Sequence, residues 1–317
     1  MSNRDTVVVT GHQSEEKQNR IRAAAGERAR VEFVSSLEDA RDLLPEATAI
    51  AGGAPQGTLA SAPNVRWVHS WAAGPDADLT DEVLHSDVIL TSSVGNGAIP
   101  LAEHSMMLML MLNREAMRWI EAQRNKRWDR FTHAELNGLT LGIFGVGHAG
   151  TDLAAKAKAF HMRVLGCRRR PEIAVPNVDE MFSLDRLHEF LAQSDVVVVT
   201  APRTPLTAGV FNDAAFAAMK DTAHFICISR GGIADDDALL RALQDGTIAG
   251  AGIDAHGIEP LPEDSPFWGA PNTIVTPHNG ATTAATASRG FEIFIGNVER
   301  FVQGKDLSNV VDKVAGY

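Results

Sequence analysis

Cysteine is almost absent from this sequence. The 317 residues include two cysteines, Cys167 and Cys227, and two thiols cannot form a disulfide framework. Both lie in predicted strands, and buried, reduced thiols of this kind are typical of a cytoplasmic protein. We therefore expect a cytoplasmic location and a fold that does not depend on disulfides.

Long hydrophobic runs are also missing. The longest, residues 105–112, is bounded by Glu103 and Arg114, whereas a membrane-spanning helix needs about 20 apolar residues. Residues 1–5 are polar, and the apolar run at residues 7–9 is too short for the core of a signal peptide. The sequence thus predicts neither a membrane span nor an export signal.

Positive charge is in deficit. The chain has 40 acidic and 29 basic side chains, a net charge of −11, so general binding to nucleic acid or to an anionic membrane is not expected. Hydrophobic residues make up 44% and charged residues 22%, as in a folded globular protein rather than a disordered one. The length predicts about two domains.

Short apolar segments alternate with helical patterns along most of the chain. The predicted strands are residues 6–10, 49–51, 65–68, 88–90, 140–144, 163–165, 196–199, 225–228, 251–253 and 273–275. The predicted helices include residues 15–25, 37–44, 100–127, 151–160 and 282–303. Strands rich in Val, Ile and Leu that alternate with helices indicate parallel sheets covered on both faces, an α/β fold. We place a domain boundary near residues 97–101.

A glycine-rich turn follows the strand at residues 140–144. It reads Gly145-x-Gly147-x-x-Gly150 and leads into the predicted helix at residues 151–160, and His148 and Ala149 within it are further candidate cofactor residues. The glycines allow a tight turn and a close approach of pyrophosphate, and the helix N-terminus supplies N–H groups to the phosphates. This arrangement predicts a dinucleotide site.

The end of the next strand indicates which dinucleotide. An NAD site usually has Asp or Glu there for the ribose hydroxyls. This chain has Arg168, Arg169 and Arg170 instead, and no carboxylate before Glu172. Because guanidinium groups suit a 2′-phosphate, we predict NADP(H) as the preferred cofactor, with NAD(H) as the alternative.

Three further segments each follow a predicted strand and carry a polar side chain suited to catalysis, namely Arg230, Glu259 and His278. With the glycine loop they resemble the D-2-hydroxyacid dehydrogenase family. Matching motifs also stand at residues 70–76, 102–104 and 201–207, so the resemblance covers nearly the whole chain.

The resemblance implies a role for each matching residue. Arg230 would hold the substrate carboxylate and carbonyl, His278 would donate the proton, and Glu259 would orient the imidazole. The backbone N–H groups of Ala73 and Gly74 would bind the carboxylate. Asp254 would contact the nicotinamide carboxamide, and further cofactor contacts would come from Ala201, Pro202, Thr207, Ile228, Ser229 and Gly280.

The resemblance also implies an organisation and a branch. Residues 1–100 with 284–317 would form a flavodoxin-like substrate-binding domain, and residues 101–283 a Rossmann dinucleotide-binding domain, with a cleft between them. The segment after Glu259, with Trp268, looks like the glyoxylate/hydroxypyruvate reductase branch, where an aromatic residue narrows the pocket. Trp268 could equally be a packing residue, and Trp128 is another candidate for the pocket wall.

Other features have plainer interpretations. His256 stands where the family usually has an aromatic residue, so we interpret it as a packing or wall residue. The three aspartates at residues 235–237 are interpreted as a helix N-terminus. No metal site is expected, because the histidines show no ligand spacing. Family members are usually homodimers through the dinucleotide domain. A bulkier 2-oxo acid, a formate-type reaction and a nucleotide-gated binding module without turnover remain open as alternatives.

Overall fold

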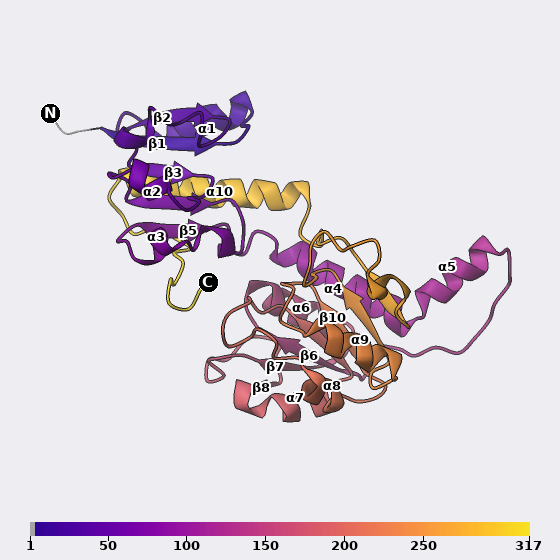
Figure 1. Ribbon diagram of the computed structural model, residues 1–317. Helices are drawn as coiled ribbons and strands as arrows, with labels where there is room; N and C mark the ends of the chain where they lie inside the picture. Colours follow the sequence, from indigo (N-terminus) through magenta and orange to yellow (C-terminus); the bar gives the residue numbers. More distant parts are fainter. Residues whose placement is uncertain (1–3) are drawn as a thin grey trace. The chain divides into compact units, whose positions relative to one another are not determined.

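The computed structural model describes residues 4–317, which form two compact units. Unit 1 contains the described residues up to Asn96 together with Thr283–Tyr317, and unit 2 is Gly97–Thr282. Each unit is built around its own parallel β-sheet (Figure 1). The predicted α/β class with two doubly wound sheets is confirmed.

Unit 1 has a five-stranded sheet in the order β2-β1-β3-β4-β5, the flavodoxin-like order. Its strands are β1 (Asp5–Thr10), β2 (Ala29–Val34), β3 (Ala49–Ala51), β4 (Trp67–Ser70) and β5 (Ile89–Ser92). Its helices are α1 (Glu15–Ala25), α2 (Thr58–Ser61), α3 (Asp81–Leu84) and α10 (Ala284–Val302), with the 3-10 turns η1 (Leu44–Glu46) and η2 (Asp76–Asp78). Helix α10 belongs to this unit because its Phe294 stacks on Trp67 of β4, with ring centroids 5.8 Å apart.

Unit 2 has a seven-stranded sheet in the order β12-β11-β10-β9-β6-β7-β8. Its strands are β6 (Thr140–Phe144), β7 (Arg163–Cys167), β8 (Glu180–Phe182), β9 (Val196–Val199), β10 (His224–Cys227), β11 (Gly250–Ile253) and β12 (Thr273–Val275). Its helices are α4 (Ala98–Asn113), α5 (Ala116–Arg124), α6 (His148–Ala159), α7 (Leu187–Gln193), α8 (Asp213–Ala217) and α9 (Asp236–Gln244), with the 3-10 turns η3 (Leu184–Arg186) and η4 (Pro266–Gly269).

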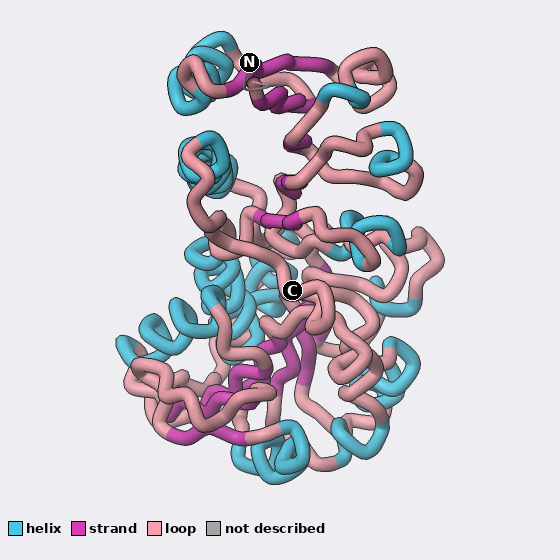
Figure 2. The backbone as a smooth tube through the Cα atoms, turned by 90° about the vertical axis from the view of Figure 1, so that its left-hand side faces the viewer, coloured by secondary structure: helices cyan, strands magenta, loops and turns pink. Residues whose placement is uncertain are grey.

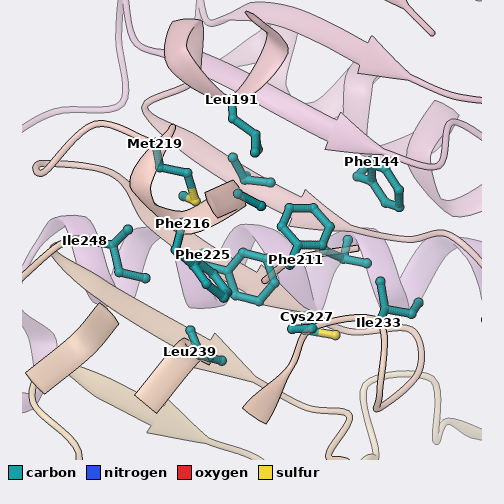
Figure 3. Close-up of a cluster of buried hydrophobic side chains, with 14 of the residues drawn as sticks. Phe144, Leu191, Phe211, Phe216, Met219, Phe225, Cys227, Ile233, Leu239 and Ile248 are labelled. Carbon is teal, nitrogen blue, oxygen red and sulfur yellow. The ribbon is translucent and has the colours of Figure 1, made fainter. Parts of the chain in front are cut away.

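The sheet of unit 2 is buried between two hydrophobic layers. One layer contains Phe211, Phe216 and Phe225, with the rings of Phe211 and Phe225 5.0 Å apart (Figure 3). The other includes Leu108 of α4 and Leu153 of α6. Helices flank the strands of this unit on both sides (Figure 2), which explains why the strands β6, β9 and β11 are buried along their whole length rather than at alternate residues.

Several predicted elements need correction. The single helix expected at residues 100–127 is two helices, because Glu115 adopts a left-handed conformation (φ 50°) that ends the first. The helix expected at residues 37–44 is a series of turns at residues 37–43 that leads into η1 at Leu44, and Pro45 has no N–H to continue an α-helical hydrogen-bond pattern. Strands β2 and β8 were not predicted. Within residues 4–317, no helix is long and apolar enough to cross a membrane.

Candidate active site

The candidate active site lies at one edge of the sheet of unit 2. Because the strands are parallel, the loops that follow them meet at the same edge. Strands β7 and β8 are added on one side of β6, and β9 to β12 on the other side. Open α/β sheets bind ligands at such a switch point in strand order. The loops at this edge carry Gly145, Arg168, Ala201, Arg230, Glu259 and His278.

Glu259 and His278 form a hydrogen-bonded pair. The Nδ1 of His278 lies 2.9 Å from Oε1 and 2.8 Å from Oε2 of Glu259. A carboxylate only accepts, so Nδ1 carries a hydrogen and Nε2 is left for a ligand. Each side chain is 36% exposed, which leaves the pair accessible to a small molecule.

Glu259 is held as a carboxylate. Burial acts to raise its pKa, but the backbone N–H of His256, 2.8 Å from Oε1, and the His278 ring outweigh this, so the pKa of Glu259 lies below its ordinary range. The carboxylate therefore faces Nδ1 of His278 as a charged hydrogen-bond acceptor.

His278 occupies an unusual backbone conformation. Its φ of 50° is left-handed, a region that costs a residue with a Cβ roughly 1–2 kcal/mol. Such strain persists where the surroundings enforce it, and it often marks a functional site. The surroundings here centre on Asp254.

Asp254 follows β11 and is fully buried. Its Oδ1 accepts from the Thr276 hydroxyl (2.6 Å) and the Asn279 N–H (3.1 Å), and its Oδ2 accepts from the Gly280 N–H (3.0 Å). The carboxylate therefore fixes the backbone on both sides of His278. The contact of Asp254 with the nicotinamide carboxamide stays a prediction.

Gly280 and His104 complete this cluster. A Cβ on Gly280 would lie 2.9 Å from Asp254 Oδ2 and 3.2 Å from the His104 ring, so a side chain there would displace the carboxylate. The Nε2 of His104, on α4, is 3.1 Å from the Thr276 hydroxyl. Sequence reasoning gave no role to His104 or Thr276. The one available signal was that both belong to motifs that flank predicted strands or helices.

Arg230 lies just beyond β10, the strand beside β11. Its Nη1 donates to the carbonyl oxygen of Ser229 at 2.8 Å, and its own carbonyl accepts from the Cys227 thiol at 3.5 Å. The residue is half-buried. A guanidinium has five N–H groups in a planar fork.

The glycine loop has the geometry that a dinucleotide needs. Gly145 has φ 95°, and a Cβ there would lie 2.4 Å from the backbone of Ala201, so the loop packs directly on the turn after β9. Gly147 is exposed, and a Cβ there would meet nothing within 4 Å. Helix α6 begins at His148, with Ala149 in its first turn, so its N-terminal N–H groups open onto that space. These residues fit a bound pyrophosphate.

Arg168 connects the loops after β6 and β7. Its guanidinium donates to the carbonyl oxygens of Val146 (3.2 Å), Arg170 (2.9 Å) and Ile173 (2.5 Å). These bonds use three of five donors and fix the group beside the glycine loop. Arg169, the next residue, is exposed.

The remaining predicted cofactor residues line the same edge. Thr207 is buried, and its hydroxyl donates to the Pro202 carbonyl at 2.7 Å, so it shapes the loop after β9. Ile228 is buried, and the Ser229 hydroxyl is buried without a hydrogen-bond partner.

The predicted substrate residues are divided between the units. Ala73 and Gly74 lie in unit 1, in the loop after β4, where Ala73 is exposed. Trp268 lies in η4 of unit 2, is 57% exposed and donates from Nε1 to the Pro262 carbonyl at 2.8 Å. Trp128 is 91% exposed. Their contacts with substrate stay predictions.

The three aspartates at residues 235–237 begin α9. The Asp235 carboxylate accepts from the Ala238 N–H at 2.9 Å, so the interpretation as a helix N-terminus is confirmed. Within residues 4–317, no group of three or more His, Cys, Asp or Glu side chains is arranged to hold a metal ion.

Comparison with known proteins identifies the class. Residues 106–280 match the model of the D-isomer specific 2-hydroxyacid dehydrogenase, NAD binding domain. The chain therefore belongs to the D-isomer specific 2-hydroxyacid dehydrogenase family, whose members are oxidoreductases that use NAD(P).

Particular relatives agree with this assignment. A D-isomer specific 2-hydroxyacid dehydrogenase family protein from Aeromonas salmonicida has a TM-score of 0.86 at 31% identity, with 98% of this chain and 99% of that chain covered. An NADPH-dependent glyoxylate/hydroxypyruvate reductase from Sinorhizobium meliloti, in complex with NADP and sulfate, has a TM-score of 0.85 at 30% identity, with 99% of this chain and 100% of that chain covered. D-3-phosphoglycerate dehydrogenase of Rattus norvegicus is 32% identical over 290 residues, 90% of this chain and 53% of that protein, so the chain spans about half the length of this relative.

Proposed function

We propose that this protein reduces a small 2-oxo acid of the glyoxylate or hydroxypyruvate class to the D-2-hydroxy acid, with NADPH as the preferred coenzyme. The observation that carries the proposal is the Glu259–His278 pair, on the loop edge that also holds Arg230 and the glycine loop. Bound NADPH would supply the hydride. The protein's own residues would hold the acid and deliver the proton.

His278 is the proposed proton donor. Glu259 occupies Nδ1, which fixes the ring and leaves the Nε2 hydrogen for the carbonyl oxygen of the substrate. As negative charge develops on that oxygen, the proton moves from Nε2, and the carboxylate stabilises the imidazolium until then. The reverse reaction would use the neutral ring as a base.

Arg230 is the proposed substrate-binding residue. Its planar fork suits a carboxylate and the adjacent carbonyl oxygen together. Ala73 and Gly74 would add backbone donors from unit 1. Arg230 would therefore affect both substrate binding and turnover.

Arg168 and Arg169 support the choice of NADPH. Arg168 is held beside the glycine loop by three carbonyl oxygens, and we propose that its other N–H groups bind the 2′-phosphate. The Sinorhizobium meliloti relative is NADPH-dependent by name.

The substrate class rests on that same relative and on Trp268, which we propose narrows the pocket. A homodimer through unit 2 is part of the proposal. The exposed apolar side chains on α4 and α5 support it, and they are Ile99, Met107, Met117, Trp119 and Ile120.

The decisive experiment measures kcat/KM of the full chain with NADPH for glyoxylate, hydroxypyruvate and phenylpyruvate, and in the oxidative direction, with NADP⁺, for formate and D-3-phosphoglycerate. We expect glyoxylate and hydroxypyruvate to be the best substrates. A preference for phenylpyruvate would overturn the substrate class alone. Binding of NADPH without turnover of any of these acids would indicate a binding module instead.

A second experiment tests the coenzyme. We expect NADPH to be preferred over NADH by at least about tenfold in kcat/KM, since one charge-assisted hydrogen bond contributes about 1.5–3 kcal/mol. Arg169→Asp and Arg168→Asp should reduce this preference, mainly through the KM for NADPH. Activity with NADH is the matched control, because Arg168 also supports the glycine loop. Equal use of both coenzymes by the unmodified protein would contradict the assignment.

A further inference from the structure

We propose that His256 is a positioning residue. Through its backbone and its ring it would hold together the three loops of unit 2 that carry Arg230, Glu259 and His278. The proposal deepens the function proposed above and rests on it. His256 follows β11, three residues before Glu259, and is 6% exposed. Buried polar atoms are normally hydrogen-bonded, so the partner of each ring nitrogen of His256 has to be identified.

The backbone of His256 contacts two of the loops. Its N–H donates to Oε1 of Glu259 at 2.8 Å and so orients the carboxylate that binds His278. Its carbonyl oxygen lies 1.7 Å from the position that a Cβ on Gly231 would take. The loop of His256 is thus pressed against the residue that follows Arg230, and a side chain at Gly231 would force the two loops apart.

The ring of His256 contacts the third loop. Its Nε2 lies 3.0 Å from the carbonyl oxygen of Thr276, two residues before His278. A carbonyl only accepts, so Nε2 is the donor and carries a hydrogen. The next residue, Pro277, has no backbone N–H to donate. The ring bond to Thr276 therefore helps to fix the backbone just before His278, whose φ is left-handed.

The other ring nitrogen shows that the imidazole is not there for packing alone. Nδ1 of His256 is buried and has no hydrogen-bond partner. A buried polar atom without a partner is unfavourable, and a phenylalanine of similar shape would avoid that cost. The feature that phenylalanine cannot supply is the Nε2 hydrogen, which is the group that reaches Thr276. We therefore assign the histidine to positioning rather than to packing.

The test compares His256→Phe, which keeps the ring, with His256→Gln, whose side-chain amide can place an N–H near the position of Nε2. His224→Phe is the matched control, since His224 begins β10 at the opposite edge of the same sheet. For each full-length protein we would measure kcat, the KM for NADPH and glyoxylate, the thermal unfolding midpoint, and amide hydrogen exchange of residues 278–280 without coenzyme.

For His256→Phe we expect kcat to fall about tenfold, the change that the loss of one hydrogen bond would give. The KM for NADPH should stay within about twofold and exchange at residues 278–280 should quicken, while the unfolding midpoint changes little. His256→Gln should keep most of the normal kcat and most of the slow exchange at residues 278–280. His224→Phe should change neither kcat nor this exchange.

Three results would overturn the proposal. These are unchanged exchange at residues 278–280 in His256→Phe, a His256→Gln protein as impaired as His256→Phe, or a fall in kcat matched by a general loss of folded protein. If the unmodified chain reduces no 2-oxo acid, the proposed function fails, and the exchange measurement still decides whether His256 positions the loop.

Discussion

Two histidines, one in each unit, lie at the carboxyl ends of parallel strands but in opposite environments. His69 is the third residue of β4 in unit 1 and is fully buried. Its Nδ1 lies 2.8 Å from the Thr91 hydroxyl, which also accepts from Trp67 Nε1 at 2.8 Å. Burial lowers the pKa of His69 to about 4. This ring is therefore neutral near pH 7.

His278 follows β12 in unit 2 and is 36% exposed. Its partner is the carboxylate of Glu259 rather than a hydroxyl, and the pKa of that carboxyl is held below its ordinary range, burial being outweighed by the His256 N–H and the His278 ring. One ring nitrogen faces a negative charge and the other remains available. The comparison shows that a strand-end histidine becomes a candidate acid through its partner and its access to solvent, and not through its place in the sheet.

The largest expected effect comes from removing the proposed acid. His278→Ala should lower kcat by about 10²–10⁴-fold, because a positioned proton donor contributes about that much. The measurement is steady-state reduction of glyoxylate with NADPH, with an unfolding curve to show that the variant is folded. His69→Gln is the control in unit 1 and should keep normal turnover. Near-normal rates for His278→Ala would remove the distinction between the two histidines.

The next effect concerns acid stability and sharpens the role of His69. Its pKa is lowered from 6.5 to about 4 in the fold, so the unfolded chain takes up the proton first as pH falls. The free energy of unfolding is therefore highest above about pH 6.5 and falls between that pH and about 4. The expected fall is about 3 kcal/mol, since one pKa unit corresponds to about 1.4 kcal/mol.

His69→Gln keeps polar groups at this position but cannot titrate. It should therefore lose less stability between pH 7 and pH 4 than the unmodified protein does. Hydrogen exchange of residues 67–70 at the two pH values reports the opening of unit 1. The same loss in both proteins would mean that His69 takes up its proton while folded.

A smaller effect is expected for the partner carboxylate. Glu259→Gln keeps a hydrogen-bond acceptor for Nδ1 but removes the charge that stabilises the imidazolium. We expect kcat to fall about 10- to 100-fold, because the general acid stays positioned but loses the charge of its partner. The measurement is steady-state reduction of glyoxylate with NADPH. A variant with full activity would show that the charge of Glu259 is unimportant.

The smallest effect is expected at the hydroxyl beside His69. Thr91→Val removes the shared partner of Trp67 and His69, and a buried polar group left unpaired costs about 1–3 kcal/mol. We expect a loss of about 1–2 kcal/mol in the stability of unit 1 and no change in kcat, measured by urea unfolding and steady-state kinetics. A large fall in kcat would show that the His69 cluster supports catalysis.

The sequence alone determined the fold class and the main candidates for the site. Apolar strands that alternate with helices can be recognised locally, and so can the glycine turn from Gly145 to Gly150. Arg230, Glu259 and His278 were identified because each follows a predicted strand, and parallel strands bring such loops to one edge. The branch within the family followed from the motif around Trp268.

Tertiary structure alone decided the partners and the burial of these side chains. The Asp254 carboxylate spans 25 and 26 positions to the N–H groups of Asn279 and Gly280, and the His256 ring spans 20 to Thr276. Contacts over such separations depend on strand order, which local patterns do not encode. The burial of His69 is decided in the same way, because a side chain's surroundings come from segments that are distant in the chain, here Thr91 of β5.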